Sequence, residues 1–246
     1  MKRLVMLIAS LASLVVIAAP VVPGVTAVNA PRIPVKQGTS LNWSGYDVPA
    51  SASPVTCVSG TWQVPTVTAT STNAYSSVWV GIDGDGSNTV EQIGTEQDWV
   101  VGRGAVYSVW YEMYPKFPVT ISMPISPGDT FTASVRAQPK NTFVLTITNV
   151  TRNQTFTTTQ KCPSARLASA EWIVEAPWSG GVLPLANFGT VKFTGCTATI
   201  GGITGDIANF SYDAIDMVNS SGALKDHTSK LSGGGTSFSV TYLSSN

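Results

Sequence analysis

Apolar and polar residues alternate along most of this chain, in short runs separated by Gly, Pro, Asn and Ser. A period of two is typical of β-strands, and no window of helical length carries a capped apolar stripe with a period of 3.6. The pattern predicts strands over residues 56–64, 76–82, 105–114, 130–137, 142–149, 154–159 and 237–243. The segments 142–149 and 154–159 are spaced as the two arms of a hairpin.

Roughly a dozen strands of this kind in about 200 residues fit one all-β domain. The predicted fold is a two-sheet antiparallel β-sandwich of the concanavalin or jelly-roll-like type. We expect this single domain to span residues 41–246, because no internal repeat or long linker divides them. Residues 28–40, which contain Pro31, Pro34 and Gly38, read as an extended leader or a short propeptide.

The first residues resemble an export signal. Met1, Lys2 and Arg3 form a positive start, and an almost unbroken apolar run follows over residues 4–22. Small residues end the run, so residues 1–27 are predicted to be a secretory signal peptide with its exit at Ala27 or at Ala30. A membrane anchor is the alternative, because the run is nearly long enough to span a bilayer. We expect a secreted, extracellular protein that acts as a monomer.

Charge excludes one class of partner. Removal of the signal takes Lys2 and Arg3 from the 14 basic residues and none from the 14 acidic residues, which leaves a net charge near −2. Nucleic-acid binding requires a basic patch, and the chain offers none. The charged fraction is 11%, so self-repulsion changes little as carboxylates gain protons, a property compatible with acidic surroundings.

Cysteine and histidine usage narrows the chemistry. An exported chain meets an oxidising compartment, so Cys57, Cys162 and Cys196 predict one disulfide and one leftover thiol, with three pairings open. The sequence contains one histidine, His227, in a polar stretch near the C-terminus. Serine, cysteine and zinc hydrolases need well-placed imidazoles, so a carboxylate is the expected catalytic group.

Several carboxylates fall on strand faces that also carry tryptophan. Residues two apart in a strand share a face, which places Glu171 beside Glu175 and Glu112 beside Trp110. A glutamate on an apolar face is partly desolvated, and desolvation raises its pKa. Such strands are suited to line one groove. The alternative is that these are ordinary rim carboxylates with aromatic residues in the core.

Six short motifs, taken together and in this order, resemble the glutamic peptidases, or eqolisins. The likeness runs from about residue 41 to residue 200. Its motifs are Asn42-Trp43-Ser44-Gly45-Tyr46, Thr61-Trp62-Gln63-Val64-Pro65, Trp79-Val80-Gly81-Ile82-Asp83-Gly84, Glu91-Gln92-Ile93-Gly94, Trp110-Tyr111-Glu112-Met113-Tyr114-Pro115 and Ala170-Glu171-Trp172-Ile173-Val174-Glu175.

The resemblance implies a sandwich with a concave substrate groove and an acid-active endopeptidase that uses a Gln/Glu dyad. The catalytic pair carries over onto Gln92 and Glu175, with Gln97 and Glu171 as rivals. Matching positions near the pair are the supporting Asp83, Asp98, Glu112 and Glu171, and the substrate-binding Trp43, Trp79 and Tyr111. The fungal cysteine after Gly84 is replaced here by Gly86 and Ser87, which leaves Cys162 without that partner and Cys57 as a possible mate.

The dyad is chemically self-sufficient. A glutamate can take a proton from water as that water attacks a peptide carbonyl. A neutral glutamine amide can donate to the developing oxyanion, which an ionised carboxylate cannot do. The sequence therefore implies polypeptide substrates and no metal or cofactor.

Two other classes of function stay open at this stage. Glu112 and Glu175 could form the carboxylate pair of a β-sandwich glycoside hydrolase, although Gln92 then has no role. A non-catalytic glycan-binding module is the other alternative, with Trp43, Trp62 and Trp79 as its platform.

Overall fold

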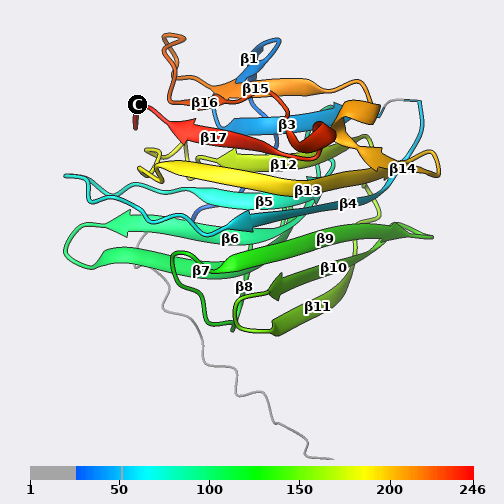
Figure 1. Cartoon of the computed structure of the whole chain (residues 1–246), viewed down its shortest axis with the longest axis horizontal. Coiled ribbons are helices and arrows are strands. Elements are labelled where there is room, and N and C mark those ends of the chain that lie inside the picture. Colours follow the sequence, from blue (N-terminus) through cyan, green and yellow to red (C-terminus); the bar gives the residue numbers. More distant parts are fainter. Residues whose placement is uncertain (1–25, 51) are drawn as a thin grey trace, which may run out of the picture.

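The computed structural model describes residues 26–50 and 52–246 as a sandwich of two β-sheets (Figure 1). In Figure 1 the strands of both layers run in broadly the same direction, as aligned sandwich packing requires. The predicted all-β sandwich is thereby confirmed. Most of the predicted signal peptide lies outside the described residues. In the described part, no helix is long and apolar enough to cross a membrane.

One sheet has nine strands, in the order β1-β2-β15-β3-β12-β5-β6-β7-β8. All pairs are antiparallel except β2 with β15, which are parallel. Its strands are β1 (Pro34–Lys36), β2 (Thr39–Ser40), β3 (Trp43–Pro49), β5 (Ser77–Ile82), β6 (Val90–Val100), β7 (Gly104–Tyr114), β8 (Val119–Ile121), β12 (Ser169–Glu175) and β15 (Asp213–Met217).

The other sheet has eight strands, in the order β11-β10-β9-β4-β13-β17-β16, with β14 paired to β13. The predicted hairpin forms between β10 and β11. Its strands are β4 (Val55–Gln63), β9 (Thr130–Gln138), β10 (Thr142–Asn149), β11 (Gln154–Lys161), β13 (Thr190–Ile200), β14 (Ile203–Asp206), β16 (Asp226–Thr228) and β17 (Phe238–Tyr242).

The main core lies between the sheets and follows the alternation of the sequence. In β10, Phe143, Leu145 and Ile147 are fully buried, whereas Val144 and Thr146 between them are partly exposed. Among the largest buried side chains in this core are Trp62, Phe131, Phe193 and Trp172. Burial of this apolar surface, at about 25 cal/mol per Å², is the main force that holds the layers together.

The outer face of the eight-stranded sheet is bound by neutral hydroxyl pairs across neighbouring strands. Their oxygens are 2.8–3.2 Å apart, so each pair is a hydrogen bond. The pairs are Ser59–Thr197, Thr61–Thr132, Thr146–Thr157, Thr148–Thr155, Thr190–Thr241 and Thr199–Thr204. We call these residues the hydroxyl face.

The nine-stranded sheet is buried on both sides. Every residue of β5 and β12 is buried, because the face turned away from the main core carries a second apolar cluster. That cluster consists of Trp43, Trp79, Val90, Trp110 and Ile173. We call this face of the sheet the site face, because the predicted Gln92 and Glu175 also lie on it.

Candidate active site

The central strands of the nine-stranded sheet bring the predicted pair to one face. Across β5, Gln92 of β6 lies opposite Gly81, and Glu175 of β12 lies opposite Ser77. Trp79 stands between these two positions on the same face of β5. Its ring and that of Trp43 meet edge to face, with centroids 5.0 Å apart. Residues far apart in sequence therefore form one cluster.

Two glycines make room for the Trp79 indole. A Cβ atom at Gly94 would overlap the Cβ of Trp79 and the carbonyl oxygen of Val78. At Gly81 it would lie 2.8 Å from the indole ring. Because any larger residue would displace the ring, these contacts explain why the Trp79–Gly81 and Gln92–Gly94 motifs contain glycine.

Glu175 is fully buried and held from three sides. Its Oε2 accepts a hydrogen bond from Trp79 Nε1 at 3.0 Å, and its Oε1 accepts one from Asn42 Nδ2 at 3.3 Å. The backbone N–H of Ala30 also donates to Oε1, at 2.9 Å. Burial raises the pKa of Glu175 well above its usual range, and the nearby Glu112 carboxyl raises it further, while these hydrogen bonds act in the opposite direction.

Gln92 is oriented by two acceptors. Its Nε2 donates to the carbonyl oxygen of Asn29 at 2.7 Å and to Glu112 Oε2 at 3.1 Å. Both amide protons are thus used, and the Gln92 Oε1 has no partner. Burial raises the pKa of Glu112 to about 8, although the Asn29 N–H also donates to it at 3.0 Å. A neutral amide donor is therefore fixed beside a backbone carbonyl.

The two ends of one peptide bond contact the predicted pair. Gln92 donates to the carbonyl oxygen of Asn29, and Glu175 accepts from the nitrogen of the next residue, Ala30. The flanking Val28 forms an antiparallel bridge with Trp178, with N···O distances of 3.0 and 2.9 Å. The chain thus places its own backbone across the site face in an extended form.

Comparison with known proteins identifies the family. The profile of the Peptidase A4 family matches residues 41–242, which is most of the chain. The chain belongs to the Peptidase A4 family. This confirms the resemblance to glutamic peptidases that the sequence motifs carry. The matched region begins just before the Asn42-Trp43 motif, so Asn29 and Ala30, which contact the dyad positions, precede it.

Curated relatives and a solved structure agree with this assignment. Aspergillopepsin-2 of Aspergillus niger is 33% identical over 194 residues, and Scytalidopepsin B of Scytalidium lignicola is 33% identical over 173 residues. These alignments cover 67% and 65% of this chain, and the chain spans 66% and 64% of the two relatives. Scytalido-glutamic peptidase, solved with a peptide-based transition state analog, superposes with a TM-score of 0.69 at 28% identity. That match covers 82% of this chain and 98% of the solved chain.

In this Peptidase A4 member, Asp83 anchors a loop. Its Oδ2 accepts hydrogen bonds from the backbone N–H groups of Arg166 and Leu167, and its Oδ1 accepts one from Ala168, at 2.8–3.0 Å. The backbone of Asp83 itself has a positive φ of 71°. These contacts tie the loop before β12 to the end of β5, so Asp83 supports the site by holding the strand that carries Glu175.

Replacement of Asp83 by alanine should lower the free energy of unfolding by about 3 kcal/mol, because three backbone donors lose their acceptor and alanine tolerates positive φ poorly. Urea denaturation of both proteins measures the difference. Asp83→Asn is the matched control, because it keeps one acceptor oxygen and tolerates this backbone, and it should lose less than half as much. An equal loss in both variants would contradict the role of the acceptor.

The other predicted carboxylates lie on the site face without contacting the pair directly. Glu171 lies opposite Asp47 in the register of β3 and β12, and neither of its carboxylate oxygens has a partner. Burial raises its pKa well above the usual range. Asp98 is buried, which raises its pKa to about 7. Glu171 and Asp98 are therefore protonated over a wider range of acidic pH than exposed carboxyl groups.

Two predicted residues lie away from this cluster. The ring of Tyr111 stacks on Phe156 of the other sheet, with centroids 6.0 Å apart, because Tyr111 and the adjacent Glu112 point to opposite faces of β7. Gln97 likewise points away from Gln92, and its Nε2 donates to the Ser76 carbonyl at 3.0 Å. The structure thus brings Gln92, and not Gln97, next to Glu112.

The predicted disulfide does not form among the described residues. Cys57, Cys162 and Cys196 are all free thiols. Cys162 and Cys196 belong to the main core, whereas the half-buried Cys57 lies next to the inward-facing Val58 and so points outward. Cys57 and Cys162 therefore lie on opposite sides of a sheet, which corrects the pairing considered from the sequence.

Several contacts of the site were missed from the sequence. Asn42 donates to Glu175, and its position directly before Trp43 in the first motif is the sequence signal for this contact. Glu96 was not considered, despite having the same strand parity as Gln92. The contacts of Asn29 and Ala30 could not be predicted from the sequence. Both residues contact the site through backbone atoms, which every residue has, so no side-chain pattern marks them.

Proposed function

We propose that this chain is a glutamic-type endopeptidase that hydrolyses peptide bonds with Glu175 and Gln92. One observation carries the proposal, namely that these side chains contact the nitrogen and the carbonyl oxygen of a single peptide bond. An enzyme that cleaves such a bond needs a donor at the oxygen and a proton carrier at the nitrogen. Family membership supports the same reaction class.

The proposed reaction uses one water molecule. Ionised Glu175 takes a proton from that water as the water oxygen attacks the carbonyl carbon. The carbonyl oxygen becomes an oxyanion, which the Gln92 amide stabilises by hydrogen bonding. The C–N bond then breaks, and protonated Glu175 gives its proton to the leaving nitrogen. The products are a carboxyl group and an amine, and Glu175 returns to its starting state.

We further propose that the activity is favoured by acid. Glu112 accepts from the same Gln92 nitrogen that serves the substrate oxygen, and burial raises the pKa of Glu112 to about 8. Below that value Glu112 is neutral and does not repel the oxyanion. Above it, the ionised carboxylate places negative charge beside the oxyanion, so cleavage should decline as the pH rises through about 8. The acid limit of the activity is set by Glu175, which has to be ionised to act and whose ionised form the hydrogen bonds from Trp79 and Asn42 favour.

We also propose that the protein is secreted and that its leader is removed from the site before it acts. The signal peptide over residues 1–27 and the leader over residues 28–40 are inferred from sequence composition. Because Val28, Asn29 and Ala30 cover the dyad, a polypeptide substrate has to displace this segment before it reaches Gln92 and Glu175. The activity is therefore expected to rise when the leader leaves the site.

Gln92→Ala should reduce the cleavage of unfolded casein by about a hundredfold to a thousandfold, which is the usual cost of losing one oxyanion donor. The assay compares this variant with wild type between about pH 2 and 8, with pepstatin and EDTA present. Full activity in Gln92→Ala would contradict the proposal. If wild type cleaves no polypeptide at any pH, either with the leader in place or after its removal, the peptidase assignment falls.

Neither rival function gains support from the described residues. Trp62 is only 1% exposed and lies in the main core, where its Nε1 donates to Thr95. It therefore cannot join Trp43 and Trp79 in one exposed platform for glycans, and the last two are themselves fully buried. A glycoside hydrolase built on Glu112 and Glu175 leaves the Gln92–carbonyl contact without a use.

A further inference from the structure

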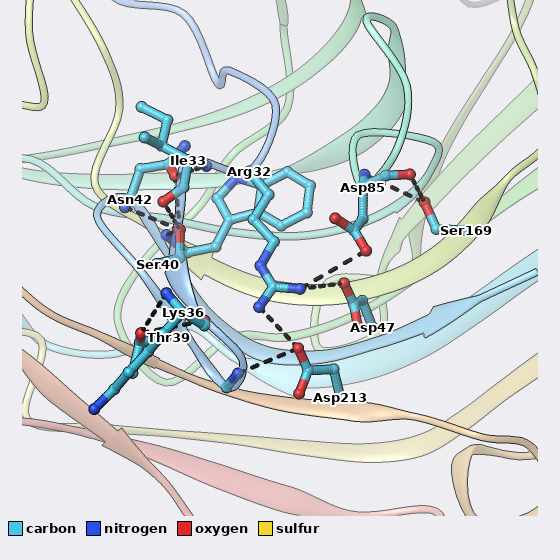
Figure 2. Close-up of polar contacts among 12 residues, drawn as sticks. Arg32, Ile33, Lys36, Thr39, Ser40, Asn42, Asp47, Asp85, Ser169 and Asp213 are labelled. Atoms are coloured by element: carbon cyan, nitrogen blue, oxygen red, sulfur yellow. Dashed lines mark hydrogen bonds and ion pairs between the residues drawn. The ribbon is translucent and has the colours of Figure 1, made fainter.

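Arg32 is enclosed by three carboxylates next to the site face (Figure 2). Its Nη1 lies 3.1 Å from Asp47 Oδ2 and 3.7 Å from Asp85 Oδ2. Its Nη2 lies 2.8 Å from Asp213 Oδ2. The Arg32 side chain is 6% exposed, so this contact is far from an ordinary surface ion pair, which is worth little.

The three acids and the arginine belong to different parts of the chain. Asp47 on β3, Asp85 after β5 and Asp213 on β15 all fall inside the family match over residues 41–242, whereas Arg32 precedes it. Among residues 26–50 and 52–246, no other cationic side chain lies within ion-pair distance of these carboxylates. The domain thus carries an acidic set whose cation comes from the leader.

This acidic set needs a cation. Asp47 is fully buried, and its Oδ1 has no hydrogen-bond partner. Loss of the cation would leave a buried carboxylate beside two others, and an uncompensated buried charge costs several kcal/mol. When the leader leaves, the same carboxylates would favour a new cationic group in the same place.

The position of Arg32 relative to the dyad is fixed by backbone contacts. Arg32 is the third residue after the Asn29 carbonyl that Gln92 contacts. Between these points, Trp43 Nε1 donates to the Ala30 carbonyl at 3.0 Å, and Asn42 Nδ2 donates to the Pro31 carbonyl at 3.1 Å. A substrate bound in the same register would present the side chain of its third residue after the cleaved bond to the acidic set.

We propose that Asp47, Asp85 and Asp213 form a subsite for a basic side chain on the third residue after the cleaved bond, and that the chain's own Arg32 fills it here. This subsite deepens the proposed peptidase function and rests on it. Arginine fits better than lysine, because the two Nη atoms of a planar guanidinium reach different carboxylates at once. The preferred substrates are thus polypeptides with arginine at that position.

A first experiment tests whether the acidic set holds Arg32, and it does not depend on catalytic activity. Hydrogen exchange of the backbone amides in residues 28–33 is followed by mass spectrometry in the whole chain. Arg32→Gln and Asp213→Asn should each accelerate exchange by about tenfold or more, which is the effect expected for loss of a partly buried charge pair. Lys36→Gln is the matched control, because Lys36 lies in the same segment, is exposed and points away from the three acids in Figure 2.

A second experiment uses peptides supplied separately. Peptides with the sequence of residues 28–36 carry Arg, Lys, Gln or Glu at the position of Arg32. The Arg peptide should be cleaved at least about tenfold faster than the Gln peptide by wild type, and Asp213→Asn should reduce this ratio severalfold. A change of Lys36 to Gln in the peptide should leave the rate unaltered.

The outcomes separate the subsite from the peptidase function. If no peptide is cleaved, the peptidase proposal fails, and the subsite is judged by whether excess Arg peptide accelerates leader exchange more than the Gln peptide does. If exchange in Arg32→Gln equals that in wild type, the subsite is wrong. If Arg32→Gln loosens the leader but the Arg and Gln peptides behave alike, Arg32 is a structural tie alone and the subsite is overturned.

Discussion

Glu175→Gln should reduce peptide cleavage by about a thousandfold or more, because glutamine cannot accept the proton of the attacking water or return it to the leaving nitrogen. Glutamine has the same shape and keeps an oxygen that can accept from Trp79 Nε1 or Asn42 Nδ2. The cluster should therefore remain assembled. The loss should appear in kcat, because a group that acts in the transition state contributes little to substrate affinity.

The matched control for this variant lies on the same strand. Glu171 shares the face of Glu175, is equally buried and has no hydrogen-bond partner for either oxygen. Glu171→Gln should retain most of the wild-type rate. Thermal unfolding of both variants checks that they are folded. The assignment of Glu175 would be refuted by a folded Glu175→Gln protein with more than about a tenth of the wild-type rate.

The free energy of unfolding should fall as the pH rises from about 4 to 8, by about 3 kcal/mol or more, since each unit of pKa shift is worth about 1.4 kcal/mol. Burial raises the pKa of several carboxyl groups in the folded chain. The values are about 8 for Glu91 and Glu112, and about 7 for Asp98 and Asp226.

The sign follows from proton binding. A group with a raised pKa in the folded state binds its proton more tightly there than in the unfolded chain, where the pKa is near 4. Its contribution is complete below about pH 4 and is lost as the pH passes through 7 to 8. Urea denaturation at several pH values measures the slope. Glu112→Gln should make the slope shallower, and a stability that stays constant or rises over this range would contradict the burial of these acids.

The alternation of side chains was sufficient to predict the sandwich and several strands to within one or two residues. Strand β10, predicted over 142–149, has those same bounds. The sequence prediction has no strand at β13, because Gly195 interrupts its alternation and its register with β4 shifts between Thr194 and Thr197. A bulge adds one residue to a strand, so the side chains after it switch faces and the alternation in the sequence no longer predicts a strand there.

The candidate site was predictable in its side chains and not in its backbone. Parity alone places Glu112 and Gln92 on the faces that the structure gives them. The alternation could not predict that Trp62 lies in the main core, because it does not show which face of a strand packs against the other sheet and which faces outward. The contacts of Arg32 depend on three elements that join only in the folded chain.

The hydroxyl face gives the outer surface of the eight-stranded sheet a set of bonds that do not respond to protons. Its six cross-strand pairs contain no group that titrates between pH 2 and 10, so the outer surface of this sheet keeps the same bonds in acid and in neutral solution. Protein engineers can therefore add charges along these threonine rows to tune solubility or attachment to a solid support. Changes of pH optimum, by contrast, would have to be sought on the site face, where Glu112 lies beside Gln92.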